Sequence, residues 1–195
     1  MWTRGPAAEY KQPARSYRIV SVSMPASYFC LNCGIPLEPQ TREGREVEGC
    51  QRCGFVLWHD PKVVTVVVVE NDRGELVLGR RGIDPGYGRW CLPGGFVNDD
   101  EDPAEAAARE CWEEVCAHID ITRLLNVYHV AKEDAPSLIG IAYSARLREG
   151  EIPQPGEEML EVAAFATDVL PELAFPSHFQ AVRDYLAARE EVKQR

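Results

Sequence analysis

The chain has 195 residues, of which 45% are hydrophobic and 27% are charged, a balance that supports a folded core and excludes a wholly disordered protein. Its formal net charge of −10 disfavours nucleic acid as a partner, so a phosphate-bearing ligand must be held locally, most simply through divalent cations. The plainer interpretation is that acidity only keeps the protein soluble. No stretch approaches the roughly 18 apolar residues that span a membrane, and residues 1–26 lack the apolar segment of a secretory signal. We therefore expect a cytoplasmic protein that does not enter a membrane.

Four of the seven cysteines form two Cys-x-x-Cys pairs with sixteen residues between them: Cys30, Cys33, Cys50 and Cys53. Two residues between thiolates let one tight turn aim both sulfurs at a single ion, and two such turns complete a tetrahedron. We predict a structural Zn²⁺ here rather than a disulfide framework. Gly34 and Gly54 follow the pairs, where the backbone must curl and glycine tolerates a positive φ. A nucleic-acid-binding ribbon and a redox dithiol remain alternatives, although four intervening glutamates disfavour the first.

Three segments are expected: a tail (1–27), a small zinc ribbon (28–60) and a larger domain (61–195). The larger domain begins with a run of Val and Thr typical of a buried strand, and an Asn-Asp-Arg-Gly turn suggests that the next strand returns as a hairpin. Its expected elements, in chain order, are strands at 63–70 and 75–80, a glycine-rich loop at 81–95, a helix at 103–115 capped by Asp100 or Asp102, strands at 119–132, 137–147 and 161–167, and an amphipathic helix at 176–192 with Phe179, Val182, Tyr185 and Leu186 at helical spacing. This order predicts an α+β sandwich.

The expected helix at 103–115 carries a cluster of acidic residues. Glu110, Glu113 and Glu114 are spaced i, i+3 and i+4, so they share one helix face and repel one another. Hard cations such as Mg²⁺ or Mn²⁺, which prefer oxygen ligands, would relieve that repulsion. Taken alone, the cluster also fits a solvated acidic face.

The full spacing resembles the Nudix box: Gly95, five residues, Glu101, seven residues, Arg109-Glu110, two residues, Glu113-Glu114. The preceding Trp90-Cys91-Leu92-Pro93-Gly94-Gly95-Phe96 is also similar to the family's lead-in. The resemblance implies a Nudix α/β/α sandwich with a mixed β-sheet, and metal-dependent hydrolysis of the pyrophosphate bond in a nucleoside diphosphate derivative. One position departs from the pattern, because Cys116 stands where the family has a glycine at the helix exit. A cysteine in a left-handed cap there would cost roughly 1 kcal/mol.

The resemblance also implies roles for individual residues. Glu110 and Glu114 would be the principal ligands of the catalytic Mg²⁺ or Mn²⁺, with help from Glu113 and the carbonyl group of Gly94. Arg109 would orient these carboxylates by bidentate hydrogen bonding, and Glu101 would support the loop and helix. By its position after the proline-rich loop, Glu158 is similar to a late metal-binding and catalytic glutamate of zinc-ribbon members, although it could also be a surface acid.

The zinc ribbon and the Trp58-His59-Asp60-Pro61 stretch resemble the Nudix subgroup that includes NADH pyrophosphatases. The Ser-Gln-Pro-Trp-Pro-Phe-Pro-x-Ser stretch of those enzymes is absent from residues 128–137, so we expect ADP-ribose as substrate, then FAD. Weaker candidates for substrate contacts lie beside the glycine-rich loop: Arg80, Arg81, Tyr87 and Arg89. Alternative functions are a sensor that binds an ADP-ribose-type ligand and a pyrophosphohydrolase of capped RNA. The family also suggests a homodimer, formed through the ribbon, the tail or the hairpin at 63–69.

Overall fold

A computed structural model of the chain describes residues 28–131 and 136–193. These residues divide into two compact units, one ending at Trp58 and the other beginning at His59, and each unit is described by itself. The tail predicted at 1–27 lies outside the described residues, and the domain limits 28–60 and 61–195 remain a proposal. No helix in the described ranges is both long and apolar enough to cross a bilayer.

The first unit is a small antiparallel sheet of β1 (Glu38–Arg42), β2 (Arg45–Gly49) and β3 (Val56–Leu57) in the order β1-β2-β3. Strands β1 and β2 are joined by Glu43 and Gly44, which both have positive φ, as a tight two-residue hairpin turn requires. Its buried cluster consists of Cys30, Leu37 and Cys50, with a few half-buried apolar side chains around them. So few buried residues provide little hydrophobic stabilisation.

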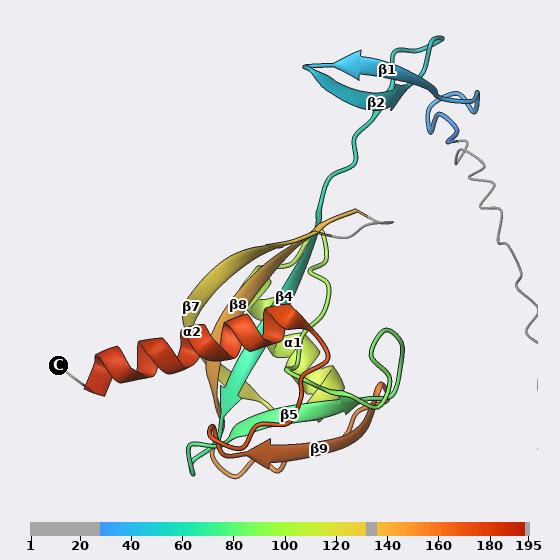
Figure 1. The fold of residues 1–195 in the computed structure, drawn as a ribbon. Helices are drawn as coiled ribbons and strands as arrows, with labels where there is room; N and C mark the ends of the chain where they lie inside the picture. Colours follow the sequence, from blue (N-terminus) through green and yellow to red (C-terminus); the bar gives the residue numbers. More distant parts are fainter. Residues whose placement is uncertain (1–27, 132–135, 194–195) are drawn as a thin grey trace, which may run out of the picture. The chain divides into compact units, whose positions relative to one another are not determined.

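The second unit is built on a mixed six-stranded sheet (Figure 1). Its strands are β4 (Lys62–Glu70), β5 (Leu76–Arg81), β6 (Trp90–Cys91), β7 (Ile119–Val130), β8 (Leu138–Leu147) and β9 (Met159–Phe165). The order is β6-β5-β4-β8-β7, and β9 pairs with β5. Strands β4 and β8 run parallel, whereas the other pairs are antiparallel. The mixed sheet expected from the sequence is therefore confirmed.

Helices α1 (Pro103–Val115) and α2 (Pro176–Lys193) cover opposite faces of this sheet (Figure 1). The alternation of β4 explains why two cores form, because successive side chains of a strand point to opposite faces. Val66 and Val68 belong to the cluster that includes the buried residues of α2. Val67 and Val69 belong to the cluster that includes the buried residues of α1. A helix, a sheet and a second helix in layers confirm the expected α/β/α sandwich.

Strands β4 and β5 form a hairpin at their turn but separate soon after it. Only Val69 with Val77 and Glu70 with Leu76 are paired in register. Beyond them β5 pairs with β6 on this edge, through Gly79 and Arg80, while β9 pairs with its other edge. The edge of β4 that β5 leaves accepts the 93–97 segment instead: the N–H of Val67 donates to the carbonyl of Pro93 at 2.9 Å. The divergence of the two strands thus creates the place where the glycine-rich segment is held against the sheet.

Three details differ from the sequence-based expectation. Of the predicted buried face of α2, Val182, Tyr185 and Leu186 pack in the core, whereas Phe179 is 45% exposed and Ala181 is fully buried in its place. A two-residue strand, β6, lies inside the expected loop because it pairs with β5. Strand β4 lies inside the sheet and its Val66–Val69 are buried, so this part of the hairpin is not available as a dimer interface.

Candidate active site

Helix α1 begins and ends as its sequence predicts. Asp102, rather than Asp100, is the N-cap, and its carboxylate accepts a hydrogen bond of 2.8 Å from the N–H of Ala104. The helix ends at Val115, and the φ of 48° and ψ of 40° of its C-cap residue, Cys116, confirm the left-handed cap. Its apolar face packs on the sheet through small side chains, those of Ala107, Cys111 and Val115 among others.

The 93–97 segment lies against the edge of β4 directly beside α1. The N–H of Thr65 donates to the carbonyl of Gly95 at 2.8 Å. A side chain at Gly94 would overlap the backbone of Thr65 and Val66, so this close approach requires glycine. The N–H of Gly94 in turn donates to Glu114 Oε2 at 2.8 Å. This bond ties the glycine-rich segment to the acidic helix.

Glu114 is the most deeply buried acidic residue of the described part of the chain, with 5% of its surface exposed. Burial raises the pKa of its carboxyl to about 8. The negative charges of Glu110 and Glu158 push the pKa in the same direction, whereas the Gly94 N–H and Arg81 oppose the shift. The carboxylates around Glu114 therefore carry more negative charge than the nearby N–H and arginine groups neutralise.

Arg109 is the central hydrogen-bond donor of the acidic cluster. Its Nε and Nη2 atoms donate to the two oxygens of Glu101 at 2.8 and 2.9 Å, and its Nη1 donates to Glu110 at 2.8 Å and to Glu113 at 3.0 Å. The bidentate partner is thus Glu101, not one of the three helix glutamates as predicted. These bonds lower the pKa of Glu101, whereas burial still raises that of Glu110 in spite of Arg109.

Glu158 is brought to the acidic cluster because the loop before β9 forms backbone hydrogen bonds with the end of α1. The N–H of Gly156 donates to the carbonyl of Glu114 at 2.9 Å, and the N–H of Gln154 donates to that of Val115 at 2.9 Å. These bonds satisfy carbonyls at the open end of α1. A side chain on Gly156 would overlap the backbone of Glu113, so the close approach again requires glycine. Glu158 follows two residues later.

The acidic helix face, the glycine-rich segment and this loop enclose one cleft of about 820 Å³. Its lining includes every residue predicted to be catalytic or to bind the catalytic metal, namely Gly94, Arg109, Glu110, Glu113, Glu114 and Glu158. A smaller cleft of about 320 Å³ lies near the β4–β5 turn and contains none of them.

Of the four weaker candidates for substrate contacts, one lines the cleft and three do not. Arg81 lines the cleft, and its Nε donates to the carbonyl of Pro85 at 2.7 Å. Arg80 lies 3.3 Å from Glu161, and Arg89 lies 2.6 Å from Glu172. Tyr87 is exposed. These three do not line the cleft, so a substrate contact from any of them would require the ligand to extend beyond it.

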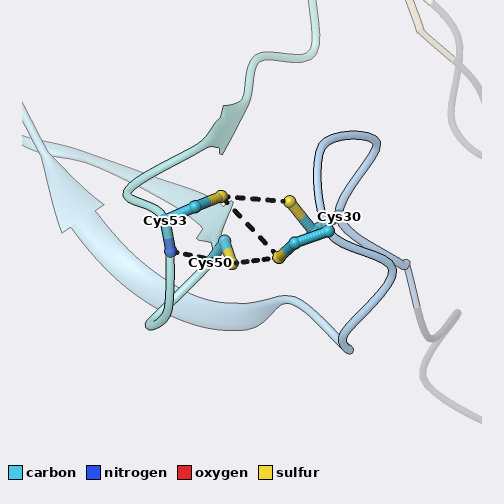
Figure 2. Close-up of side chains that lie close together, drawn as sticks. Cys30, Cys50 and Cys53 are labelled. Carbon is cyan, nitrogen blue, oxygen red and sulfur yellow. Dashed lines mark hydrogen bonds between the residues drawn. The ribbon is translucent and has the colours of Figure 1, made fainter.

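In the first unit, the four predicted cysteines gather with all their sulfurs within 4.8 Å of one another (Figure 2). The sulfur atoms of Cys30 and Cys53 are 3.4 Å apart, and those of Cys33 lie 3.5 Å from Cys50 and 3.8 Å from Cys53. Four thiolates about 2.3 Å from one ion at tetrahedral corners would lie about 3.8 Å apart, whereas disulfide sulfurs lie about 2.05 Å apart. The separations fit the corners of a metal site.

The backbone of each Cys-x-x-Cys turn prepares this arrangement. The N–H of Gly34 donates to the carbonyl of Cys30 at 2.8 Å, and Gly54 bonds Cys50 in the same way at 3.0 Å. Both glycines have φ near 75°, which confirms the expected left-handed conformation. Burial disfavours the thiolate of Cys50, but backbone N–H groups such as that of Cys53 outweigh it and lower the pKa to about 6. Such a thiol is ready to bind a cation.

A family model described as the NUDIX domain matches residues 59–185. The chain belongs to the Nudix hydrolase family. An ADP-ribose pyrophosphatase of Methanocaldococcus jannaschii is 32% identical over 133 residues, which cover 68% of this chain and 77% of that protein. The NAD-capped RNA hydrolase NudC of Chromobacterium violaceum is 30% identical over 151 residues, which cover 76% of this chain. They cover 53% of NudC, so this chain spans about half of that relative.

Among solved structures, a NUDIX hydrolase from Nitrosomonas europaea has a TM-score of 0.75 and is 29% identical. The similarity covers 84% of this chain and 92% of that one. Together with the family match, it establishes the chain as a Nudix pyrophosphohydrolase with a four-cysteine module in front of its catalytic fold.

Sequence reasoning missed two side chains of this Nudix site. Trp112 lines the cleft, although its position in the sequence assigned it no role there. His178 of α2 is partly buried, and its Nδ1 accepts a hydrogen bond of 3.1 Å from the N–H of Leu92, just before the glycine-rich segment. Burial lowers the pKa of His178 to about 3, so the ring is neutral and can accept this bond. No local pattern indicates such a contact, because the two residues are far apart in sequence.

Proposed function

We propose that this Nudix enzyme hydrolyses the diphosphate bond of a nucleoside diphosphate derivative, with ADP-ribose as its first substrate and FAD as its second. The observation that carries the proposal is the single cleft that gathers Glu110, Glu113, Glu114 and Glu158 against Gly94. The similarity to an ADP-ribose pyrophosphatase supports the choice of substrate. The absence of the NADH pyrophosphatase stretch from residues 128–137 disfavours NADH.

The donor set of the cleft fits Mg²⁺ or Mn²⁺, because carboxylate oxygens are the ligands that these hard cations prefer. Glu110 and Glu114 would hold the cation, with Glu113 and Glu158 assisting. The raised pKa values of Glu110 and Glu114 support this, since a cation would offset the charge that burial leaves uncompensated. When bound, such a cation polarises the diphosphate and lowers the pKa of the attacking water.

The side chains and backbone of the protein supply the positioning. Arg109 holds Glu110 and Glu113 toward one another while Glu101 fixes the guanidinium from the other side. The N–H of Gly94 holds Glu114. Glu158, which is exposed at the cleft, is our choice to accept the proton of the attacking water, through the carboxylate oxygen that does not bind the cation.

For the cysteine cluster we propose a bound Zn²⁺ with a structural role. Four sulfur ligands would fill the tetrahedral coordination of zinc and leave no position for substrate or water. The small buried cluster of this unit supports the idea that the ion stabilises the module. A homodimer, expected from the family, and a cytoplasmic location, expected from the sequence, complete the proposal.

A second candidate is hydrolysis of a nucleotide cap on RNA, which the similarity to NudC favours. The net charge of −10 weighs against RNA as a tight partner, because phosphate backbones bind through basic side chains. A ligand sensor is less favoured, since a binding protein gains nothing from several buried or clustered carboxylates that repel one another.

The test is a product assay on purified protein with Mg²⁺ or Mn²⁺ and a panel of ADP-ribose, FAD, NADH, diadenosine polyphosphates and NAD-capped RNA. Glu114→Gln is the inactive comparison, and Glu105→Gln, an exposed acid on the same helix, is the matched control. Release of AMP from ADP-ribose by the wild type and the control alone would support the proposal. Absence of cleavage of every compound, with ligand binding retained, would replace it with the sensor function.

A further inference from the structure

Trp112 is a large aromatic residue that remains 48% exposed inside the catalytic cleft. It is the one tryptophan of the described residues that lines this cleft. Its neighbours in α1 are the acidic residues Glu110, Glu113 and Glu114, all within two positions. Side chains one or two positions apart on a helix point in different directions, but Trp112 and these three carboxylates all line the same cleft, so the indole ring is within the site that would hold the diphosphate.

The indole ring is held in a fixed orientation by residues behind it. The ring of His118 stacks on it with centroids 4.4 Å apart and planes inclined by 28°. His118 is itself fixed, because its Nδ1 lies 2.7 Å from the carboxylate of Glu151 and its carbonyl accepts a bond of 3.1 Å from the N–H of Arg148. His118 does not line the cleft, so it covers one face of the indole and leaves the other to the cleft.

A flat, pre-oriented aromatic face beside a phosphate site matches the chemistry of a nucleotide. Bases stack on aromatic side chains whatever their hydrogen-bonding edges, since every base has a π-face. The carboxylates around Trp112 repel phosphate in the absence of a cation, whereas a neutral ring system carries no charge to be repelled.

We propose that Trp112, supported by His118 and Glu151, is the stacking platform for the aromatic ring system of the nucleotide substrate. This subsite rests on the proposed function, because it assumes a nucleoside diphosphate derivative in the cleft. Since stacking reads the ring and not its polar edges, Trp112 sets a requirement for an aromatic base while tolerating different bases.

The experiment compares binding of AMP and of ribose 5-phosphate by isothermal titration calorimetry, in the presence of Mg²⁺. The variants are Trp112→Ala and Trp112→Phe, and Phe179→Ala serves as the control because it removes an equally exposed aromatic residue of α2 outside the cleft. We expect Trp112→Ala to weaken AMP about tenfold and to leave ribose 5-phosphate unchanged. Trp112→Phe should restore most of the AMP affinity.

Fluorescence supplies an independent signature. AMP should quench tryptophan emission of the wild type and of Phe179→Ala, whereas Trp112→Phe should bind AMP without that quenching. With a cleavable substrate, Trp112→Ala should raise KM while kcat at saturation changes little, since a stacking contact made equally in the ground and transition states affects binding alone.

Two results would overturn the platform. Equal weakening of AMP and ribose 5-phosphate by Trp112→Ala would show that the residue only supports the helix. Unchanged AMP affinity would place the base elsewhere, and Phe96→Ala, at the other exposed aromatic residue of the cleft, would then be the variant that loses it. Because these measurements need no turnover, failure of the enzyme to cleave any substrate would refute the proposed function and leave the platform to be judged by AMP binding.

Discussion

The burial of Glu114 leads to a prediction that can be measured without substrate. Its carboxyl is 5% exposed and its folded-state pKa is about 8, against an ordinary value of 4.5. The change we consider is Glu114→Gln, which keeps the size of the side chain and an oxygen that can accept the hydrogen bond from Gly94, but removes the charge. In protein without Mg²⁺ or Mn²⁺, this variant should be more stable than the wild type at high pH.

The sign follows from proton linkage. Because the folded state raises the pKa of Glu114, the folded protein holds this proton more tightly than the unfolded chain does. The contribution of Glu114 to the free energy of unfolding of the wild type is therefore fully present below the unfolded pKa of 4.5. It is lost as the pH rises toward the folded pKa of about 8. Between pH 5 and pH 8 the loss from this one group is roughly 3–4 kcal/mol. Glutamine has no such group, so the variant escapes the loss.

The assay is urea unfolding at pH 5 and pH 8, followed by circular dichroism and tryptophan fluorescence, without chelator so that the cysteine module is left intact. Titrating groups that do not interact with Glu114 contribute equally to both proteins and cancel in the difference. Glu105→Gln is the control, because Glu105 is an exposed acid of the same helix. Addition of Mg²⁺ at pH 8 should stabilise the wild type and not Glu114→Gln. A difference between the two proteins that is the same at both pH values would refute the reasoning.

Three further predictions follow from individual contacts. Arg109→Lys keeps the charge but loses the bidentate pair with Glu101, so kcat/KM should fall roughly 10- to 100-fold in a steady-state assay, and an unchanged rate would contradict this role. Cys116→Gly removes a side chain from a left-handed cap, so the free energy of unfolding should rise by about 1 kcal/mol in denaturant titration, and a loss of stability would argue against the strain. Removal of metal with a chelator, or Cys50→Ser, should unfold the first unit while the second keeps its structure, as amide hydrogen exchange would report; protection that persists in residues 28–58 would be evidence against a structural Zn²⁺.

Much of the fold could be predicted because the information is local. The limits of α1 depend on a capping aspartate, a proline in the first turn and an apolar face of small residues, all of which lie within a few positions of one another. The left-handed conformation at Cys116 follows from the same local rule. The limits of α2 and most of its buried face were predicted equally well, and only Phe179 is turned away from the core by the way the helix packs on the sheet.

The candidate site also has a part that local spacing predicts and a part that it does not. Spacing on one helix face was enough to place Glu110, Glu113 and Glu114 together, and two Cys-x-x-Cys turns were enough to indicate a four-sulfur cluster. The bidentate pairing of Arg109 with Glu101 could not be inferred, since a guanidinium surrounded by several carboxylates chooses among them by geometry. The substrate candidates Arg80 and Arg89 illustrate the opposite error, because proximity in sequence to the glycine-rich loop did not bring them to the cleft.

The sequence by itself therefore determined the family, the catalytic helix and the cysteine module, because each depends on residue types at short, regular spacing. Only the tertiary structure decided how the rest of the site is assembled. Glu158 joins the cleft because backbone N–H groups of the preceding loop bond the open carbonyls at the end of α1. Trp112 lines the cleft with its ring stacked on His118, which Glu151 holds in turn. Such contacts depend on backbone atoms, which every residue has, and on segments brought together by the sheet, so no side-chain pattern announces them.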